Sequence, residues 1–71
     1  MSITEVPISG VIRLGQFLQV AGLIDSGADA KSVIADGLVR VNGDIELRRG
    51  RQLQPGDVVD FSGRSARVAA D

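Results

Sequence analysis

The residues with the clearest chemical potential are three arginines within four positions, Arg48, Arg49 and Arg51. Guanidinium groups form paired hydrogen bonds with phosphate oxygens, so such a cluster is typical of a phosphate-binding surface. Gly50 lies inside the cluster and relieves backbone constraint, which favours a close approach to a ligand. The alternative is a solvated loop whose charge is balanced by Asp44 and Glu46.

The positive charge is concentrated in the middle of the chain, although the net charge of all 71 residues is −1 at pH 7. Residues 31–54 contain five of the eight basic residues and three of the nine acidic ones, a local net charge of +2. Lys31 and Arg40 belong to this segment. Together with the arginine cluster they predict one basic face on an otherwise acidic molecule.

The composition argues against an enzyme. The chain has no cysteine and no histidine, so it lacks a thiolate nucleophile, the commonest general base and the commonest metal ligand. Asp57 and Asp60 are too isolated for a metal pair, and the glycine spacing matches neither a P-loop nor a dinucleotide fingerprint. We therefore expect a binding module without catalytic activity, metal or cofactor.

Aromatic residues limit the kind of nucleic acid that the chain could bind. Proteins that bind single strands stack the bases on aromatic rings, and this chain has only Phe17 and Phe61, with no tryptophan or tyrosine. Phe17 lies on an apolar helical stripe and Phe61 in an apolar strand, so both are predicted to pack in the core. A nucleic-acid ligand would then be a folded RNA, recognised by its backbone shape.

Two helices are predicted in the first half of the chain, after a short strand over Thr4–Ile8 that Pro7 would confine to a sheet edge. The first helix is expected over residues 12–21, since Leu14, Phe17, Leu18 and Ala21 have helical spacing and Gly22 follows. The second is expected over residues 27–36. Ser26 and Asp29 fit a capping box at its start, and Gly37 ends it.

Antiparallel hairpins are predicted in the second half. Strands over residues 38–41 and 44–47 flank Asn42-Gly43, the pair that a type I′ turn favours. A loop over residues 48–51 and a type II turn over 54–57 lead to a strand over 58–61. A turn over 62–65 and a strand over 66–68 close a second hairpin. This order predicts an α+β fold in which a helix-turn-helix pair packs on a small antiparallel sheet.

Several of these segments resemble the RNA-binding domain of small-subunit ribosomal protein S4, the S4 domain. The matching segments cover residues 12–61 and are Arg13-Leu14, Gly22, Ser26–Ala30, Ile34–Gly43 and Gly56–Val59. The run Ile34–Gly43 is the most specific of them. Ala30-Lys31 and Glu46–Arg51 are similar to the stand-alone bacterial YbcJ-like branch, whose members are little more than this domain.

The resemblance implies an α-L RNA-binding motif, in which two helices and the following hairpin present a basic surface to structured RNA, usually ribosomal or transfer RNA. Carried over by position, the implied RNA contacts are Arg13, Lys31, Arg40, Arg48, Arg49 and Arg51.

Two positions depart from the family pattern. Gly15 occupies a position where many members carry an acidic residue, and Gly27 one where many carry an arginine. Lys31, one turn after Gly27, is the nearest basic substitute.

The sequence therefore predicts a single domain over residues 1–71, cytoplasmic, bacterial and monomeric, with no secretory signal or membrane segment. We expect it to bind structured RNA, ribosomal more than transfer RNA, in ribosome assembly or ribosome-associated quality control. The alternative is a protein-interaction module whose arginines meet an acidic partner. Reversing Arg48, Arg49 and Arg51 to glutamate is expected to abolish RNA binding and leave the fold intact.

Overall fold

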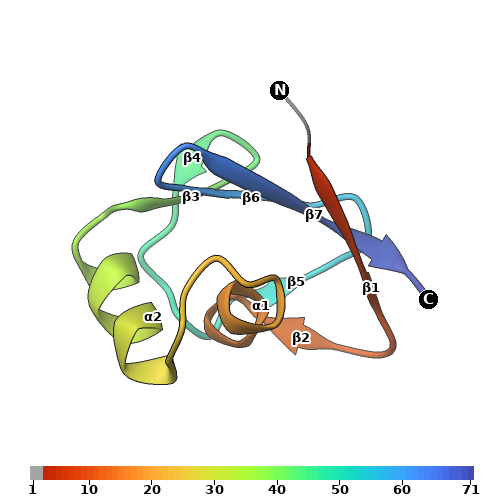
Figure 1. Ribbon diagram of the computed structural model, residues 1–71, viewed down its shortest axis with the longest axis horizontal. Helices are drawn as coiled ribbons and strands as arrows, with labels where there is room; N and C mark the ends of the chain where they lie inside the picture. The colour runs from red at the N-terminus through yellow and green to blue at the C-terminus, as the bar shows by residue number, and fades with distance from the viewer. Residues whose placement is uncertain (1–2) are drawn as a thin grey trace.

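The computed structural model describes residues 3–71, in which two helices lie on one side of a sheet (Figure 1). The elements in chain order are β1 (Thr4–Ile8), β2 (Ile12–Arg13), α1 (Leu14–Val20), α2 (Gly27–Ala35), β3 (Val39–Val41), β4 (Asp44–Ile45), β5 (Gln52–Leu53), β6 (Val58–Phe61) and β7 (Arg64–Ala70). The predicted α+β class, with a helix pair packed on a small sheet, is confirmed.

The main sheet is mixed rather than purely antiparallel. Its five strands have the order β1-β7-β6-β3-β4, and β1 pairs with β7 in parallel while all other neighbours are antiparallel. The expectation of an antiparallel sheet is therefore wrong at this edge. The two partners are about 60 residues apart in the chain, and no local pattern signals such a pairing. Pro7 does lie in an edge strand, as predicted.

The first helix starts two residues later than predicted, because Ile12 and Arg13 are extended and pair with β5 in a separate two-stranded sheet. This pairing buries Ile12 opposite Leu53. The apolar stripe of α1 is confirmed, since Leu14, Phe17 and Leu18 are fully buried. The helix ends at Val20, and Gly22 follows in the left-handed conformation.

The second helix starts as predicted and ends one residue before the predicted boundary, with Asp36 as its C-cap. The Ser26 hydroxyl accepts a hydrogen bond of 3.2 Å from the Asp29 amide, which satisfies one of the free N–H groups of the first turn. The reciprocal bond of a capping box, from the Asp29 side chain, is not formed in the described part of the chain. Ala30 and Ile34 face the core.

Both hairpins have two-residue turns. Asn42 and Gly43 have φ values of 53° and 89°, as a type I′ turn requires. Its return strand is shorter than predicted, residues 44–45 instead of 44–47, although the Glu46 amide still donates to the Val39 carbonyl at 3.0 Å. In the second hairpin the turn is Ser62-Gly63 alone, so β7 is longer than the predicted strand.

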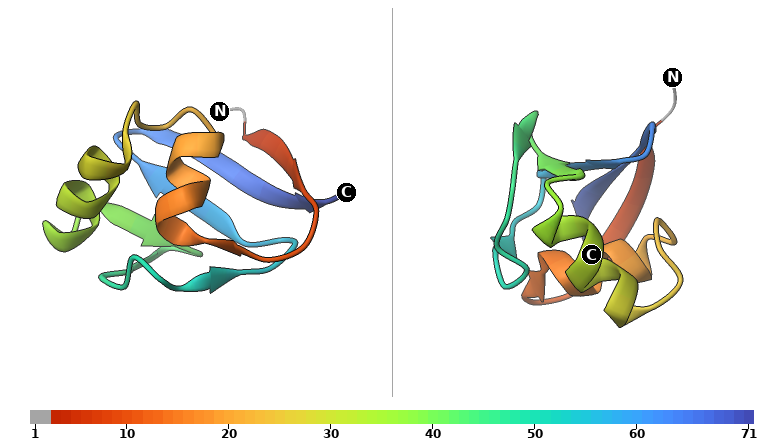
Figure 2. Two further views of the ribbon diagram at one scale, coloured as in Figure 1. Left: turned by 90° about the horizontal axis from the view of Figure 1, so that it is seen from below. Right: turned by 90° about the vertical axis from the view of Figure 1, so that its left-hand side faces the viewer.

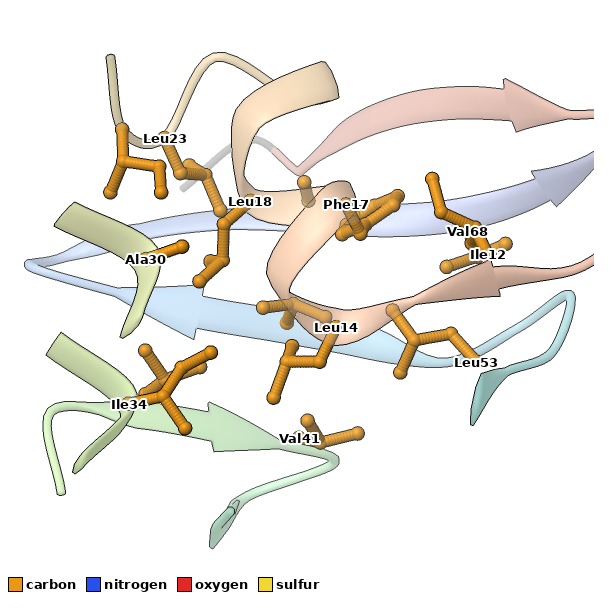
Figure 3. Packing of buried hydrophobic residues seen from close by; sticks show 14 residues of the cluster. Ile12, Leu14, Phe17, Leu18, Leu23, Ala30, Ile34, Val41, Leu53 and Val68 are labelled. Carbon is orange, nitrogen blue, oxygen red and sulfur yellow. The ribbon is translucent and has the colours of Figure 1, made fainter. Parts of the chain in front are cut away.

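The core lies between the helices and the main sheet, as the side chains in Figure 3 show. Phe17 is its largest fully buried residue, and Phe61 is partly buried against the same cluster. The predicted core roles of both phenylalanines are therefore confirmed, and the ring of Phe17 is fully enclosed.

Candidate functional site

The loop of residues 48–51, called the arginine loop below, is docked against the start of α1. The amide of Leu14 donates to the Arg51 carbonyl at 2.8 Å, and the amide of Gly15 donates to the Arg49 carbonyl at 3.1 Å. Figure 2 shows this part of the chain passing beside the start of α1. The loop thus satisfies N–H groups that a helix leaves free at its N-terminus. The sequence indicates the loop but not this docking.

A buried carboxylate holds two of the loop arginines. Glu46 is 7% exposed, and its oxygens accept hydrogen bonds from the backbone and side chain of Arg48 and from the side chain of Arg51, the latter at 2.8 Å. These bonds, first that from the Arg48 side chain and then that from Arg51, lower the pKa of Glu46 to about 2. Glu46 in turn raises the pKa of Arg48. Glu46 is therefore a structural anchor for the arginine loop, a role that was not predicted from the sequence.

The two anchored arginines differ in how much of each side chain is exposed to solvent. The side chain of Arg48 is 76% exposed and that of Arg51 is 32% exposed. Each guanidinium has more N–H donors than Glu46 accepts. One carboxylate neutralises only one of these two positive charges, so the arginine loop keeps a net positive charge after the anchor is formed.

A groove of about 420 Å³ opens between α1, the first turn of α2 and the arginine loop. It is lined by Arg13, Gly15, Gln16, Gln19, Gly27, Ala30, Arg49 and Gly50. The lining contains two arginines and three glycines but no carboxylate. Such a surface attracts an anion and lets it approach the backbone closely.

Arg13 is fixed in the wall of the groove. Its Nη1 donates to the Gly50 carbonyl at 2.8 Å, and its own amide donates to the Gln16 side chain at 3.3 Å. The first contact joins the start of α1 to the arginine loop and leaves further guanidinium donors for a ligand.

The structure places two of the six predicted contacts in the groove and two more in the arginine loop beside it. Arg13 and Arg49 line the groove, and Arg48 and Arg51 lie in the same loop. Lys31 is exposed on α2, four residues after Gly27 and therefore on the same side of the helix as that groove residue.

Arg40 lies on another face of the molecule and does not line the groove. Its neighbours in β3, Val39 and Val41, point into the core, so Arg40 points to the opposite face of the sheet. There its register partner on β6 is Asp60, and its Nη1 donates to the Gly43 carbonyl at 3.1 Å.

In residues 3–71, no helix has the length and apolar character needed to cross a bilayer. The same residues contain no group of three potential metal-binding side chains.

Residues 7–69, nearly the whole chain, match the family model described as the S4 domain. The chain belongs to the S4 domain family. This confirms the resemblance drawn from the sequence. The S4 domain is a non-catalytic RNA-binding domain, in agreement with the expectation that the protein is not an enzyme.

Two relatives resemble the S4 domain described here over most of their length. RlbA of Bacillus subtilis (strain 168), designated a candidate ribosome maturation protein, is 47% identical over 53 residues, which is 75% of each chain. YbcJ of Escherichia coli (strain K12), designated a candidate RNA-binding protein, is 39% identical over 59 residues, which is 83% of this chain and 84% of the relative.

Solved structures share the fold. The solution structure of Escherichia coli YbcJ, described as revealing an α-L motif involved in RNA binding, superimposes with a TM-score of 0.68 at 34% identity. It covers 99% of this chain and 89% of YbcJ. The crystal structure of 30S ribosomal protein S4e from Thermoplasma acidophilum has a TM-score of 0.63 at 22% identity, over 84% of this chain and 32% of that one. The latter shows likeness of fold alone.

Proposed function

We propose that this protein binds structured RNA, ribosomal RNA in preference to transfer RNA, through the groove between its helices and the arginine loop. The observation that carries the proposal is the groove's composition: two arginines and three glycines, with no carboxylate, on a protein of net charge −1. Guanidinium groups at such a surface bind backbone phosphates, which position an RNA without reading its sequence. Selectivity then depends on the shape of the RNA.

The proposed contacts differ in their position relative to the groove. Arg13 and Arg49 contact phosphates inside the groove, while Lys31, Arg48 and Arg51 extend the positive surface around it. Arg40, on the other face of the sheet, contributes only if the RNA wraps around the molecule.

The biological role proposed is ribosome assembly or ribosome-associated quality control. The designation of RlbA as a candidate ribosome maturation protein supports this role, as does that of YbcJ as a candidate RNA-binding protein. The protein would act as a monomer in the cytoplasm, where ribosomes are assembled.

The position of Glu46 changes how this proposal is best tested. Reversing Arg48, Arg49 and Arg51 together would surround the buried Glu46 with carboxylates, which removes its partners and adds repulsion. The expectation that the triple reversal leaves the fold intact therefore has no structural support. A single change at Arg49 avoids the difficulty, because Arg49 has no contact with Glu46 among the hydrogen bonds and ion pairs of residues 3–71.

The test is a titration of labelled structured ribosomal RNA at several salt concentrations. Arg49→Ala should weaken binding about tenfold, the loss of roughly one charged hydrogen bond. It should also reduce the dependence of log K on log salt by about one phosphate contact. Arg67→Ala is the matched control, because Arg67 pairs with Glu5 outside the groove.

Equal losses in both variants would contradict a groove-specific contact. Failure of the native protein to bind any RNA, with an acidic protein recovered from purified complexes instead, would favour the protein-interaction alternative. Sequencing of the bound RNA separates ribosomal from transfer RNA.

A further inference from the structure

We infer that Gly15 is a positioning residue for RNA binding: its lack of a side chain lets the stem of Arg49 lie across α1 and directs the Arg49 guanidinium into the groove. This inference rests on the proposed function, because it assigns the residue that sets the geometry of a proposed phosphate contact.

The contact between the two residues is too close for any side chain at position 15. A Cβ atom placed on Gly15 would lie 2.7 Å from Cγ and 3.3 Å from Cδ of Arg49. Real Cβ atoms essentially never approach another carbon to 2.7 Å. The nearest atom is Cγ, close to the backbone of Arg49, so relief requires a different course for the whole side chain rather than a small movement of its tip.

The backbone at the same place is held by a separate interaction. The Gly15 amide donates to the Arg49 carbonyl at 3.1 Å, and that oxygen would lie 3.6 Å from the added Cβ, an ordinary contact. The added methyl group therefore conflicts with the Arg49 side chain and not with the docking of the loop.

The conformation of Gly15 does not itself require glycine. Gly15 lies in the first turn of α1 and is not among the residues with positive φ. Glycine inside a helix is destabilising relative to alanine. Glycine at position 15 therefore weakens the helix, and the backbone conformation there does not require it. The close approach of the Arg49 side chain explains why this position has no side chain.

The experiment is a double-mutant cycle on the full chain, with Gly15→Ala, Arg49→Ala and both changes together. Labelled structured ribosomal RNA is titrated at several salt concentrations, and thermal unfolding is recorded without RNA. Gly15→Ala should weaken binding about tenfold and reduce the salt dependence by about one phosphate contact, without lowering the unfolding midpoint. In the Arg49→Ala background the same change should have no further effect, because the side chain it displaces is absent.

A second readout does not depend on RNA. The side-chain Nε–H resonance of Arg49 in the free protein should shift in Gly15→Ala, while that of Arg67 should not.

Native binding by Gly15→Ala together with weak binding by Arg49→Ala would overturn the inference and leave the proposed function standing. An equal loss from Gly15→Ala in both backgrounds would overturn it too, because the methyl group would then act on the RNA or the fold directly. Native binding by Arg49→Ala would instead contradict the groove contact of the proposed function, and an unshifted Arg49 resonance would then overturn the inference as well.

Discussion

Glu46 shows how one acidic residue can support a basic surface. It is buried, yet its carboxylate accepts hydrogen bonds from Arg48 and Arg51 and so keeps its charge. Leaving such a carboxylate without partners would be strongly unfavourable, so the two arginines and the glutamate stabilise the loop only as a unit.

The lowered pKa of Glu46 predicts a loss of stability in acid. A pKa of about 2 in the folded protein, against 4.5 for the free side chain, corresponds to about 3 kcal/mol of unfolding free energy. Because the folded-state pKa is the lower one, this contribution is complete above pH 4.5 and is lost as the pH falls towards 2. Urea unfolding of the native protein and of Glu46→Gln at pH 6 and pH 3 measures it.

Glu46→Gln should be less stable at pH 6 by about 2–3 kcal/mol and should lose less stability than the native protein between the two pH values. Glu5→Gln is the control, because Glu5 forms an exposed pair with Arg67. An identical acid sensitivity in the native protein and Glu46→Gln would contradict the assignment.

Among the elements, those formed by neighbouring residues are the ones that sequence patterns predict well. The Ser26 cap and the Asn42-Gly43 turn depend on backbone preferences within a few positions, and both occur where predicted. The pairs β2–β5 and β1–β7 join residues about 40 and 60 positions apart, and neither was predicted. Alternating apolar residues show that a strand has a buried face but not which strand lies beside it.

The candidate site likewise combines features set by neighbouring residues with features set by residues far apart in the chain. The types and exposure of its basic residues follow from the sequence, but their grouping depends on non-local contacts. Docking of the arginine loop on α1 places Arg49 in the groove, and the alternation of β3 removes Arg40 from it. The anchoring role of Glu46 has one signal in the sequence, an acidic residue two positions before an arginine cluster, and that signal alone also fits a solvated loop.

The Asn42-Gly43 turn provides a prediction at the level of an element. Gly43 has a φ of 89°, so a Cβ there is strained even though nothing lies within 4 Å of its position. Gly43→Ala should lower the unfolding free energy by roughly 1–2 kcal/mol, the usual cost of a left-handed conformation for a residue with a side chain.

Thermal unfolding with Gly27→Ala as control provides the measurement. Gly27 is a helical residue without positive φ, so alanine should be neutral or stabilising there. Equal stability of Gly43→Ala and the native protein would show that the turn adopts another conformation in solution.

The whole molecule carries a net negative charge and has no exposed aromatic ring in its described residues. General electrostatic attraction to nucleic acid is therefore weak, and the surface offers little aromatic area on which bases could stack. Both features favour an RNA whose phosphates are already arranged to fit the groove.

This predicts a strong preference for folded over unstructured RNA. In a competition assay at moderate salt, a structured ribosomal fragment should displace labelled RNA at a concentration at least about tenfold lower than a polyuridine strand of the same length does. Equal competition by the two RNAs would indicate binding to any phosphate chain and would contradict recognition by shape.

The parallel pairing of β1 with β7 also determines when the protein can fold during its synthesis. Ala66 and Val68 of β7 are buried in the core, and β7 joins β1 to β6. Until residue 70 has left the ribosome, the helices have no complete sheet to pack on, and the arginine loop has no stable α1 to dock against. We therefore expect a nascent chain to acquire its groove only after residue 70 has emerged, in one late step.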